Sequence, residues 1–366
     1  MGRRTPADRL SDARSGLEYA HIRADQCRLG SKTSKKLAVG LAMVVLAAFV
    51  LAACSGEDAP PPAPAAMGED VRGATWGASV LEVVRGDAAL EILTEANSFN
   101  EPPADGHEYV LVRLRGHNLS REDTFGNMWE ADFKVTGNEN VLYFFYARPS
   151  LVEPTPDFDF YLFPGGSGEG YMAFQVRVED TGLMLRHEPF AIFGDEDIRY
   201  LALEDGAGVT APAEPLAAAT DVGVELDSPA PLGTTIINGL FEITVLEVVR
   251  GDDALAMAIE ANQFNNEPDE GMEFVQVRIR VRNVGTEDAP LDVDGFSFNT
   301  VGDRGEIWDV PPIVYPLPEL DTNLFPGGSF EGWVTFQARA GEGSLVLIYE
   351  EFFSFSDDNT RYLALE

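Results

Sequence analysis

Carboxylate side chains gather in two short clusters that could bind a cation. One contains Asp195 and Asp197 on either side of Glu196, and the other is Asp357-Asp358, each just before a late predicted strand. Oxygen ligands of this kind suit Ca²⁺, which takes six to eight of them. Neither cluster has EF-hand spacing, and turn residues that face solvent account for both more simply. Asp195, Asp197, Asp357 and Asp358 are therefore weak calcium candidates, and we expect no metal site and no cofactor.

Histidine side chains could support acid–base chemistry because they titrate near neutral pH. The histidines outside the N-terminal segment are His107, His117 and His187. The chain repeats the surrounding sequence once, and the repeat has Met272, Arg282 and Tyr349 at the matching positions. A catalytic site common to both copies therefore cannot use histidine. The sequence also has no Gly-rich phosphate loop, nucleophile elbow or cysteine cluster, so we expect no enzymatic activity.

Cys54 lies at the end of an apolar run over 37–53 that follows several lysines, which is the order of a secretion signal. The small residues before Cys54 resemble the lipobox of bacterial lipoproteins. This resemblance implies that the Cys54 thiol receives a diacylglycerol and becomes the new N-terminus after cleavage. The alternative is a retained transmembrane helix, but the run is short and no basic stop-transfer cluster follows it. We expect an extracytoplasmic protein, lipid-anchored to the bacterial cell membrane or outer membrane.

The charge of the chain limits its partners. The formal net charge is −35, from 61 acidic and 26 basic residues. Basic residues outnumber acidic ones before Cys54, so removal of the signal makes the remainder more acidic. Such a surface repels nucleic acid and anionic lipid headgroups. We expect no nucleic-acid partner, contact with the membrane through the lipid anchor, and an unknown envelope protein, glycan or peptide as the partner.

The elements that position these residues occur twice. Val80–Asp87 recurs in full as Val245–Asp252, and Arg199–Glu204 recurs as Arg361–Glu366. Each copy has the size of an independent domain, and two copies are too few for a solenoid. We expect a signal peptide with an over-long n-region over 1–53, a Pro- and Ala-rich tether over 54–70, β-sandwich domains over 71–204 and 233–366, and a linker over 205–232.

Alternating apolar and polar residues predict antiparallel strands with one buried face, as in Glu108–Arg115 and Glu273–Arg280. Apolar residues at helical spacing over 87–97, and at the matching positions of the second copy, predict one short helix after the first strand. The Arg-Gly-Asp tripeptides at Arg85–Asp87 and Arg250–Asp252 match a sequence that integrins read. We interpret their Gly and Asp as the end of a strand and the cap of the helix.

The motifs together resemble a known family. The Val-Val-Arg-Gly-Asp strand end, the helix, the Ala-Asn-x-Phe-Asn turn and the late Phe-Pro-Gly-Gly-Ser look like telokin-like, immunoglobulin-related domains of secreted bacterial proteins, of the domain-of-unknown-function 4352 type. These are similar in fold to a mycobacterial secreted immunogenic protein family. The resemblance implies an all-β lipoprotein with two tandem immunoglobulin-like antiparallel β-sandwich domains. It implies no activity, and the buried disulfide of antibody domains is absent.

The Asn-x-Phe-Asn turn is the most specific pattern that both copies share. It comprises Asn97, Phe99 and Asn100 in the first copy and Asn262, Phe264 and Asn265 in the second. The structural interpretation is that the asparagines cap backbone groups after the helix and each Phe seals the sandwich edge. The functional interpretation is ligand contact at this turn, with Tyr171 and Trp333 as further aromatic candidates. We expect a non-enzymatic binding or interaction module, and the alternative is a structural spacer or accessory subunit of an envelope assembly.

Overall fold

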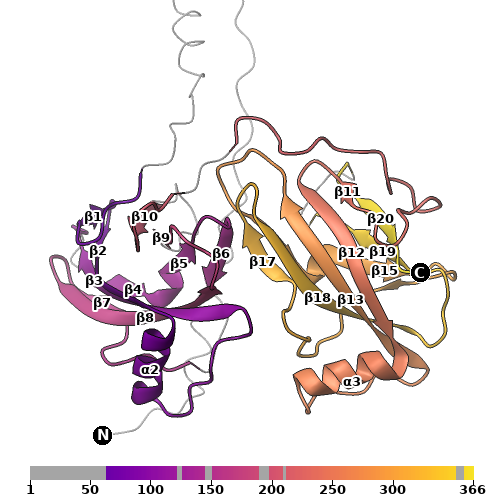
Figure 1. Ribbon diagram of the computed structural model, residues 1–366, viewed down its shortest axis with the longest axis horizontal. Helices are drawn as coiled ribbons and strands as arrows, with labels where there is room; N and C mark the ends of the chain where they lie inside the picture. The colour runs from indigo at the N-terminus through magenta and orange to yellow at the C-terminus, as the bar shows by residue number, and fades with distance from the viewer. Residues whose placement is uncertain (1–62, 122–125, 145–150, 189–197, 209–211, 352–357) are drawn as a thin grey trace, which may run out of the picture. The chain divides into compact units, whose positions relative to one another are not determined.

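A computed structural model describes residues 63–121, 126–144, 151–188, 198–208, 212–351 and 358–366 (Figure 1). The predicted signal peptide and Cys54 lie outside these residues. The described residues lie in one compact unit, Pro61–Glu366, which contains their hydrophobic clusters. Within the described part of the chain, no helix is long and apolar enough to cross a membrane.

The first copy contains ten strands and one α-helix among its described residues. They are β1 (Val71–Arg72), β2 (Trp76–Arg85), α2 (Asp87–Ala96), β3 (His107–Asn118), β4 (Gly126–Trp129), β5 (Phe133–Thr136), β6 (Val141–Phe144), β7 (Asp159–Leu162), β8 (Ser167–Arg177), β9 (Met184–His187) and β10 (Arg199–Ala202). One sheet has the order β1-β2-β3-β8, and β10-β9-β5-β6 faces it. β4 and β7 pair separately.

The second copy repeats this order. Its elements are β11 (Ile236–Ile237), β12 (Phe241–Arg250), α3 (Gly251–Ala261), β13 (Met272–Asn283), β14 (Leu291–Asp294), β15 (Phe298–Val301), β16 (Ile307–Trp308), β17 (Asp321–Leu324), β18 (Ser329–Arg339), β19 (Val346–Tyr349) and β20 (Arg361–Ala364). All of the strand pairs within these sheets are antiparallel. The all-β class is therefore confirmed. Each helix follows the second strand of its copy, because a two-residue strand precedes β2 and β12.

The core lies between the facing sheets. Val110, Val112 and Leu114 alternate along β3 and point into it, where they join Phe133 and Leu185 from the opposite sheet. Burial of such side chains is the main favourable term in folding. No cysteine is present in residues 61–366, so packing and hydrogen bonding must hold this unit together without disulfides.

The helices give the β2-β3-β8 and β12-β13-β18 sheets a second buried region on their outer faces. Ala89 and Leu93 of α2 pack with Tyr109 and Leu111 of β3, which point away from the main core. β3 is consequently buried on both faces where the helix covers it, whereas simple alternation predicted one buried face. The helix thus fixes the position of the turn that follows it.

The two copies share a sheet through their edge strands. Asn323 and Leu324 of β17 pair with Leu142 and Val141 of β6, so the sheet runs β10-β9-β5-β6-β17-β14. The Phe325 N–H donates to the Asn140 carbonyl oxygen at 2.9 Å, which extends the pairing by one residue. We refer to this β6–β17 contact as the internal joint.

Candidate functional site

The Asn-x-Phe-Asn turn has the same geometry in both copies. The Asn97 N–H donates to the Leu93 carbonyl at 3.0 Å, and its side-chain oxygen accepts from the Phe99 N–H at 3.1 Å. In the second copy Asn262 accepts from the Phe264 N–H at 3.0 Å. These bonds end the helix and reverse the chain, which is the Asx-type role of asparagine. The predicted capping role of the first asparagine is therefore present in the structure.

The last asparagine of the turn holds a distant loop. The Asn100 Nδ2 donates to the carbonyl oxygens of Leu93 and Val152, both at 2.8 Å, and its Oδ1 accepts from the Val152 N–H at 2.9 Å. Asn265 makes the same three bonds in the second copy, with carbonyl partners in Ala258 and Val314. The sequence did not indicate this contact, because the partners lie about fifty residues downstream in a segment without a marked motif.

The phenylalanine of the turn does not seal the sandwich edge. Phe99 is 88% exposed and Phe264 is 82% exposed, so both rings project into solvent. Val152 and Val314, which the asparagines hold beside the turn, are also exposed. The structural interpretation of the Phe is therefore wrong. Each copy thus has an exposed aromatic ring at the same position, on a backbone that five or more hydrogen bonds fix. This arrangement suits contact with a partner.

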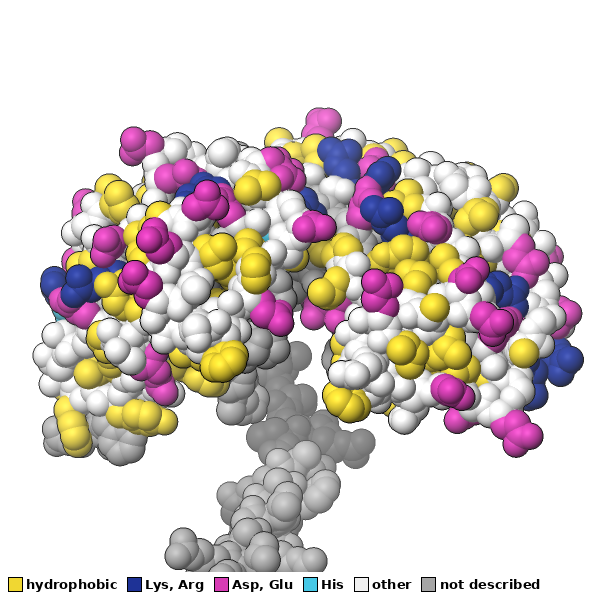
Figure 2. Space-filling model, turned by 60° about the horizontal axis from the view of Figure 1, so that its bottom comes forward, with side chains coloured by type: hydrophobic (Ala, Val, Ile, Leu, Met, Phe, Trp, Pro, Cys, Tyr) yellow, Lys and Arg dark blue, Asp and Glu magenta, His cyan; other side chains and the backbone are white. Residues whose placement is uncertain are grey.

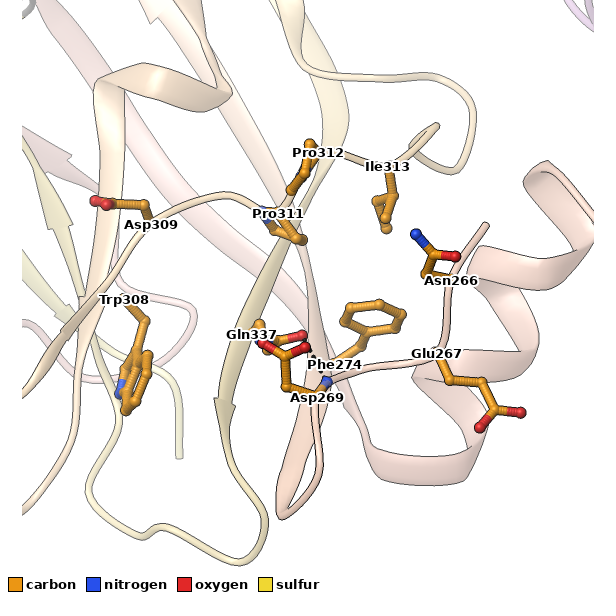
Figure 3. A pocket seen from close by; sticks show the side chains of 10 residues that line it. All are labelled: Asn266, Glu267, Asp269, Phe274, Trp308, Asp309, Pro311, Pro312, Ile313 and Gln337. Carbon is orange, nitrogen blue, oxygen red and sulfur yellow. Dashed lines mark hydrogen bonds between the residues drawn. The ribbon is translucent and has the colours of Figure 1, made fainter. Parts of the chain in front are cut away.

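A cavity of about 310 Å³ lies next to this turn in the second copy (Figure 3). Phe274 faces it from β13, and Ile313 borders it beside the Asn265 partner loop. The rest of the lining is acidic, amide, proline and indole: Asn266, Glu267, Asp269, Trp308, Asp309, Pro311, Pro312 and Gln337. The Gln337 Nε2 donates to Asp269 at 3.0 Å, which fixes one wall. The matching loop of the first copy includes 145–150, outside the described residues.

Acidic side chains follow the held loop in both copies. Glu130 lies near Glu153, Asp157 and Asp159, and burial, reinforced by these three carboxylates, raises the pKa of Glu130 to about 7. In the second copy burial and then the Asp294 carboxylate raise the pKa of Asp321. Sequence reasoning missed these groups because residues far apart in the chain meet across the β4–β7 and β14–β17 pairs.

The predicted calcium candidates gain no support from the described residues. Asp195, Asp197 and Asp357 lie outside them, and Asp358 is an exposed turn residue whose carbonyl accepts from Arg361. Across the described ranges, no group of three or more His, Cys, Asp or Glu side chains is arranged to hold a metal ion. The acidic groups around Glu130 and Asp321 are likewise not arranged to hold a metal ion.

Tyr171 and Trp333 are half-buried on the outer faces of β8 and β18. Tyr171 packs beside the α2 cluster, and the Arg113 guanidinium lies 5.8 Å from its ring centroid. A loop runs alongside the backbone of each residue, because the N–H groups of Tyr171 and Trp333 donate to the carbonyls of Pro156 and Pro318. These aromatics are therefore less accessible than Phe99 and Phe264, and their role in ligand contact stays a prediction.

His187 and Arg85, the arginine of the first Arg-Gly-Asp tripeptide, are engaged in contacts within the domain. His187 is buried and stacks on Phe133 with 4.7 Å between ring centroids. None of the three histidines lines the cavity described above. Arg85 donates to Glu108 and Glu204 at 3.0 Å and to the Asp180 carbonyl at 2.9 Å, so its guanidinium is engaged within the domain.

The aspartate of the tripeptide does not cap the helix, contrary to our interpretation. Helix α2 begins at Asp87 itself, with Gly86 as the N-cap residue and no side-chain cap bond. Gly86 has φ of 63°, which glycine adopts without a steric penalty. Asp87 instead lies in the first turn, where its charge interacts favourably with the helix dipole.

Comparison with known proteins gives a family for the second copy. The model of a domain of unknown function, DUF4352, matches residues 230–360. The second copy is the part of the chain that this family model covers. It contains the Phe264 turn, the Asn265 bonds and the cavity, and the first copy shares its motifs. No curated protein matches the chain.

Several solved structures are similar to this chain. The ycdA protein of Bacillus subtilis, a candidate lipoprotein, is 15% identical with a TM-score of 0.27, over 35% of this chain and 37% of that one. The yjhA protein of the same bacterium is 14% identical with a TM-score of 0.27, over 37% and 98%. A β-sandwich protein of Clostridium difficile is 10% identical with a TM-score of 0.24, over 41% and 97%. The chain thus spans about a third of the length of ycdA.

Proposed function

We propose that this chain is a lipid-anchored extracytoplasmic protein whose two domains bind an envelope partner without catalysing a reaction. The observation that carries the proposal is the exposure of Phe99 and Phe264 at matching, rigidly held turns. Two such rings on one chain allow two-point attachment, which strengthens binding when a partner can reach both. The lipidation of Cys54 rests on the sequence pattern around it.

The surroundings of the turns favour a protein or peptide partner that combines apolar and basic side chains. Each Phe has an exposed valine beside it, and the chain continues from that valine into an acidic group. Aromatic and aliphatic side chains would pack on the Phe and Val, while Lys or Arg would meet the carboxylates. Residues 61–366 carry a net negative charge, whereas a protein that binds nucleic acid or anionic lipid presents a positive surface.

Binding can be tested with an array of short synthetic peptides of varied sequence as the probe. We expect residues 61–366 to bind peptides that contain both a large apolar and a basic residue, with weaker binding at high salt. Phe99→Ala and Phe264→Ala should each weaken the signal, and the double variant should abolish it. Phe296→Ala is the matched control, because Phe296 is an exposed phenylalanine of the second copy outside the turn. Unchanged binding by the double variant would overturn the proposal.

The anchor has its own test. Mass spectrometry of the mature protein should find an N-terminal Cys54 with acyl chains, and Cys54→Ser should remain unacylated and be released from the membrane. An unmodified Cys54 in the wild-type protein would contradict the proposed lipidation without bearing on the Phe99 and Phe264 turns.

A structural spacer is the second candidate, and the internal joint favours it. Backbone pairing between β6 and β17 couples the two copies, which a chain of freely moving binding modules would not need. A spacer would show no selective peptide binding in the array, and the Phe99 and Phe264 substitutions would then leave its behaviour unchanged.

A further inference from the structure

The cavity of the second copy has walls that suit an organic cation. Trp308 and Phe274 supply aromatic surface, and three carboxylates complete the set: Glu267, Asp269 and Asp309. In Figure 3 Trp308 and Asp309 border the cavity on one side, and Glu267 borders it on the other. Its lining contains no Lys, Arg or His. An ammonium or guanidinium group is attracted both by carboxylates and by the face of an indole ring.

The chain itself does not pair these carboxylates with a basic side chain. Among the described residues, no Lys or Arg forms an ion pair with Glu267, Asp269 or Asp309. The Gln337 amide orients the Asp269 carboxylate, because its Nε2 donates to that group at 3.0 Å and its Oε1 accepts from the Asp269 N–H at 3.1 Å. The acidic groups of the cavity are therefore available to a bound cation.

One basic residue of the chain contacts a wall of the cavity. The Arg339 guanidinium carbon lies 5.6 Å from the centroid of the Trp308 ring, and Arg339 pairs with Glu306 at 2.7 Å. Arg339 does not line the cavity, and its pairing with Glu306 offsets the repulsion that it would exert on a bound cation. The contact also shows that the Trp308 ring accepts a guanidinium in this protein.

The fold does not require the three carboxylates. Their counterparts in the first copy are neutral residues: Pro102, Ala104 and Phe144. The backbone nevertheless keeps its form there, because the Ala104 N–H donates to the Gln175 Oε1 at 2.9 Å, as the matching pair does in the second copy. The reverse exchange occurs at one position, where Glu101 replaces Asn266. Local structure therefore does not explain why the second copy places three acidic side chains around its cavity.

We propose that this cavity binds the basic side chain of a partner, a Lys or Arg whose apolar stem lies on Trp308 and Phe274 and whose charged end meets the carboxylates. The inference rests on the proposed function, because it names the site that receives the basic group of the peptide partner. The volume of about 310 Å³ is at the lower end of the range of ligand pockets, about 300 to 1,000 Å³. Such a volume suits one side chain rather than a larger ligand.

The cavity adjoins the exposed apolar surface of the second copy. Asn266 and Ile313 line it, and each is the chain neighbour of one residue in the hydrogen-bonded contact between Asn265 and Val314. A peptide can therefore place an apolar side chain on Phe264 and Val314 and a nearby basic side chain in the cavity. Only the second copy then selects a basic residue in this way.

NMR titration of residues 61–366 with N-acetyl-lysine methylamide tests the cavity. At about 0.15 M NaCl the Debye length is about 8 Å, so the net charge of the protein is largely screened. The lysine probe should shift the Trp308 indole N–H and the Gln337 side-chain amide to saturation. The side-chain amide of Gln175, the counterpart of Gln337 in the first copy, should not shift. The norleucine analogue, which has the stem without the charge, and ammonium chloride, which has the charge without the stem, should each bind about tenfold more weakly or less.

Removal of charge gives the matched variants. Glu267→Gln/Asp269→Asn/Asp309→Asn should weaken binding of the lysine probe about tenfold. The control removes the same charge from three exposed residues of the 205–232 segment, by Glu214→Gln/Glu225→Gln/Asp227→Asn, and should leave binding unchanged. All six positions are exposed, and unchanged backbone signals elsewhere will show that both variants fold. Equal weakening by the two variants, or equal binding of ammonium chloride and the lysine probe, would overturn the proposal.

Two results separate this inference from the proposed function on which it rests. If the Trp308 signal does not respond to the lysine probe while peptide binding still depends on Phe99 and Phe264, the cavity does not bind the basic side chain and the binding function stands. If the lysine probe binds in the cavity while the peptide array gives no signal, the cation site is supported and the proposed function is wrong.

Discussion

Asn100 should be a major contributor to the stability of the first candidate site. Its buried side chain makes three hydrogen bonds, two from Nδ2 to the carbonyls of Leu93 and Val152 and one from the Val152 N–H to Oδ1. Each such bond contributes about 1 kcal/mol net, and a buried group left unpaired costs more than the lost bond. Asn100→Ala should therefore destabilise the loop at Val152 by about 3 kcal/mol. Asn265→Ala should cost less, about 1 to 2 kcal/mol, because Asn265 is partly exposed and water can replace its bonds.

Hydrogen exchange at individual amides measures this effect directly. The Val152 N–H should exchange roughly 100-fold faster in Asn100→Ala, because local opening then exposes it at a lower free-energy cost. The Val314 N–H should show a smaller acceleration in Asn265→Ala. Asn127→Ala, at an exposed position of β4, is the control and should change neither rate. If Asn100→Ala accelerates Val152 no more than the control does, the asparagine does not hold the loop and our account of the site is wrong.

Three further substitutions test other parts of the structure. Burial and neighbouring carboxylates raise the pKa of Glu130 to about 7, above its ordinary value of 4.5, so its contribution to stability is fully present below pH 4.5 and is lost as the pH rises through about 7. Glu130→Gln should remove that loss, at most about 3 kcal/mol, and urea unfolding at pH 5 and pH 8 should show a gain only at the higher pH. Gln276 and Thr335 hydrogen-bond at 2.6 Å beneath α3, where the first copy has Leu111 and Ala173. Gln276→Leu alone leaves the buried Thr335 hydroxyl without its partner. The double variant Gln276→Leu/Thr335→Ala removes that hydroxyl, so it should unfold at a higher urea concentration than the single variant. Arg85→Met should destabilise the first copy by about 2 to 4 kcal/mol because Glu108 keeps a largely buried charge, whereas Arg72→Met at an exposed pair should change stability by less than about 0.5 kcal/mol.

The sequence predicted the fold well because the signals of strands and turns are local. Alternation over Glu108–Arg115 and its repeat located β3 and β13, and the helical spacing after Asp87 located α2. The duplication helped further, because a pattern that appears twice is unlikely to be an accident of one segment. What alternation could not show was that α2 would bury Tyr109 and Leu111 on the second face of β3, since that depends on where the helix packs.

The candidate site was predicted in part. Asn97, Phe99 and Asn100 stood out as a shared pattern, yet the sequence could not say which of them points inward. The two asparagines use their side chains on the backbone, which leaves the phenylalanine between them at the tip of a tight turn with no interior to enter. A hydrophobic residue type therefore suggested burial where the geometry of its neighbours enforces exposure.

Matching positions of the two copies differ in whether the packing of the fold explains their residue type. Positions that stay buried in both copies, such as Val112 and Val277, are explained by the core. Phe99 and Phe264 are exposed in both, so no packing demand explains why the aromatic ring is present twice. Phe163 and Phe325 differ in exposure, and Phe325 lies at the internal joint, where its N–H donates to the Asn140 carbonyl. The first pair thus supports the proposal that both copies contact an outside ligand.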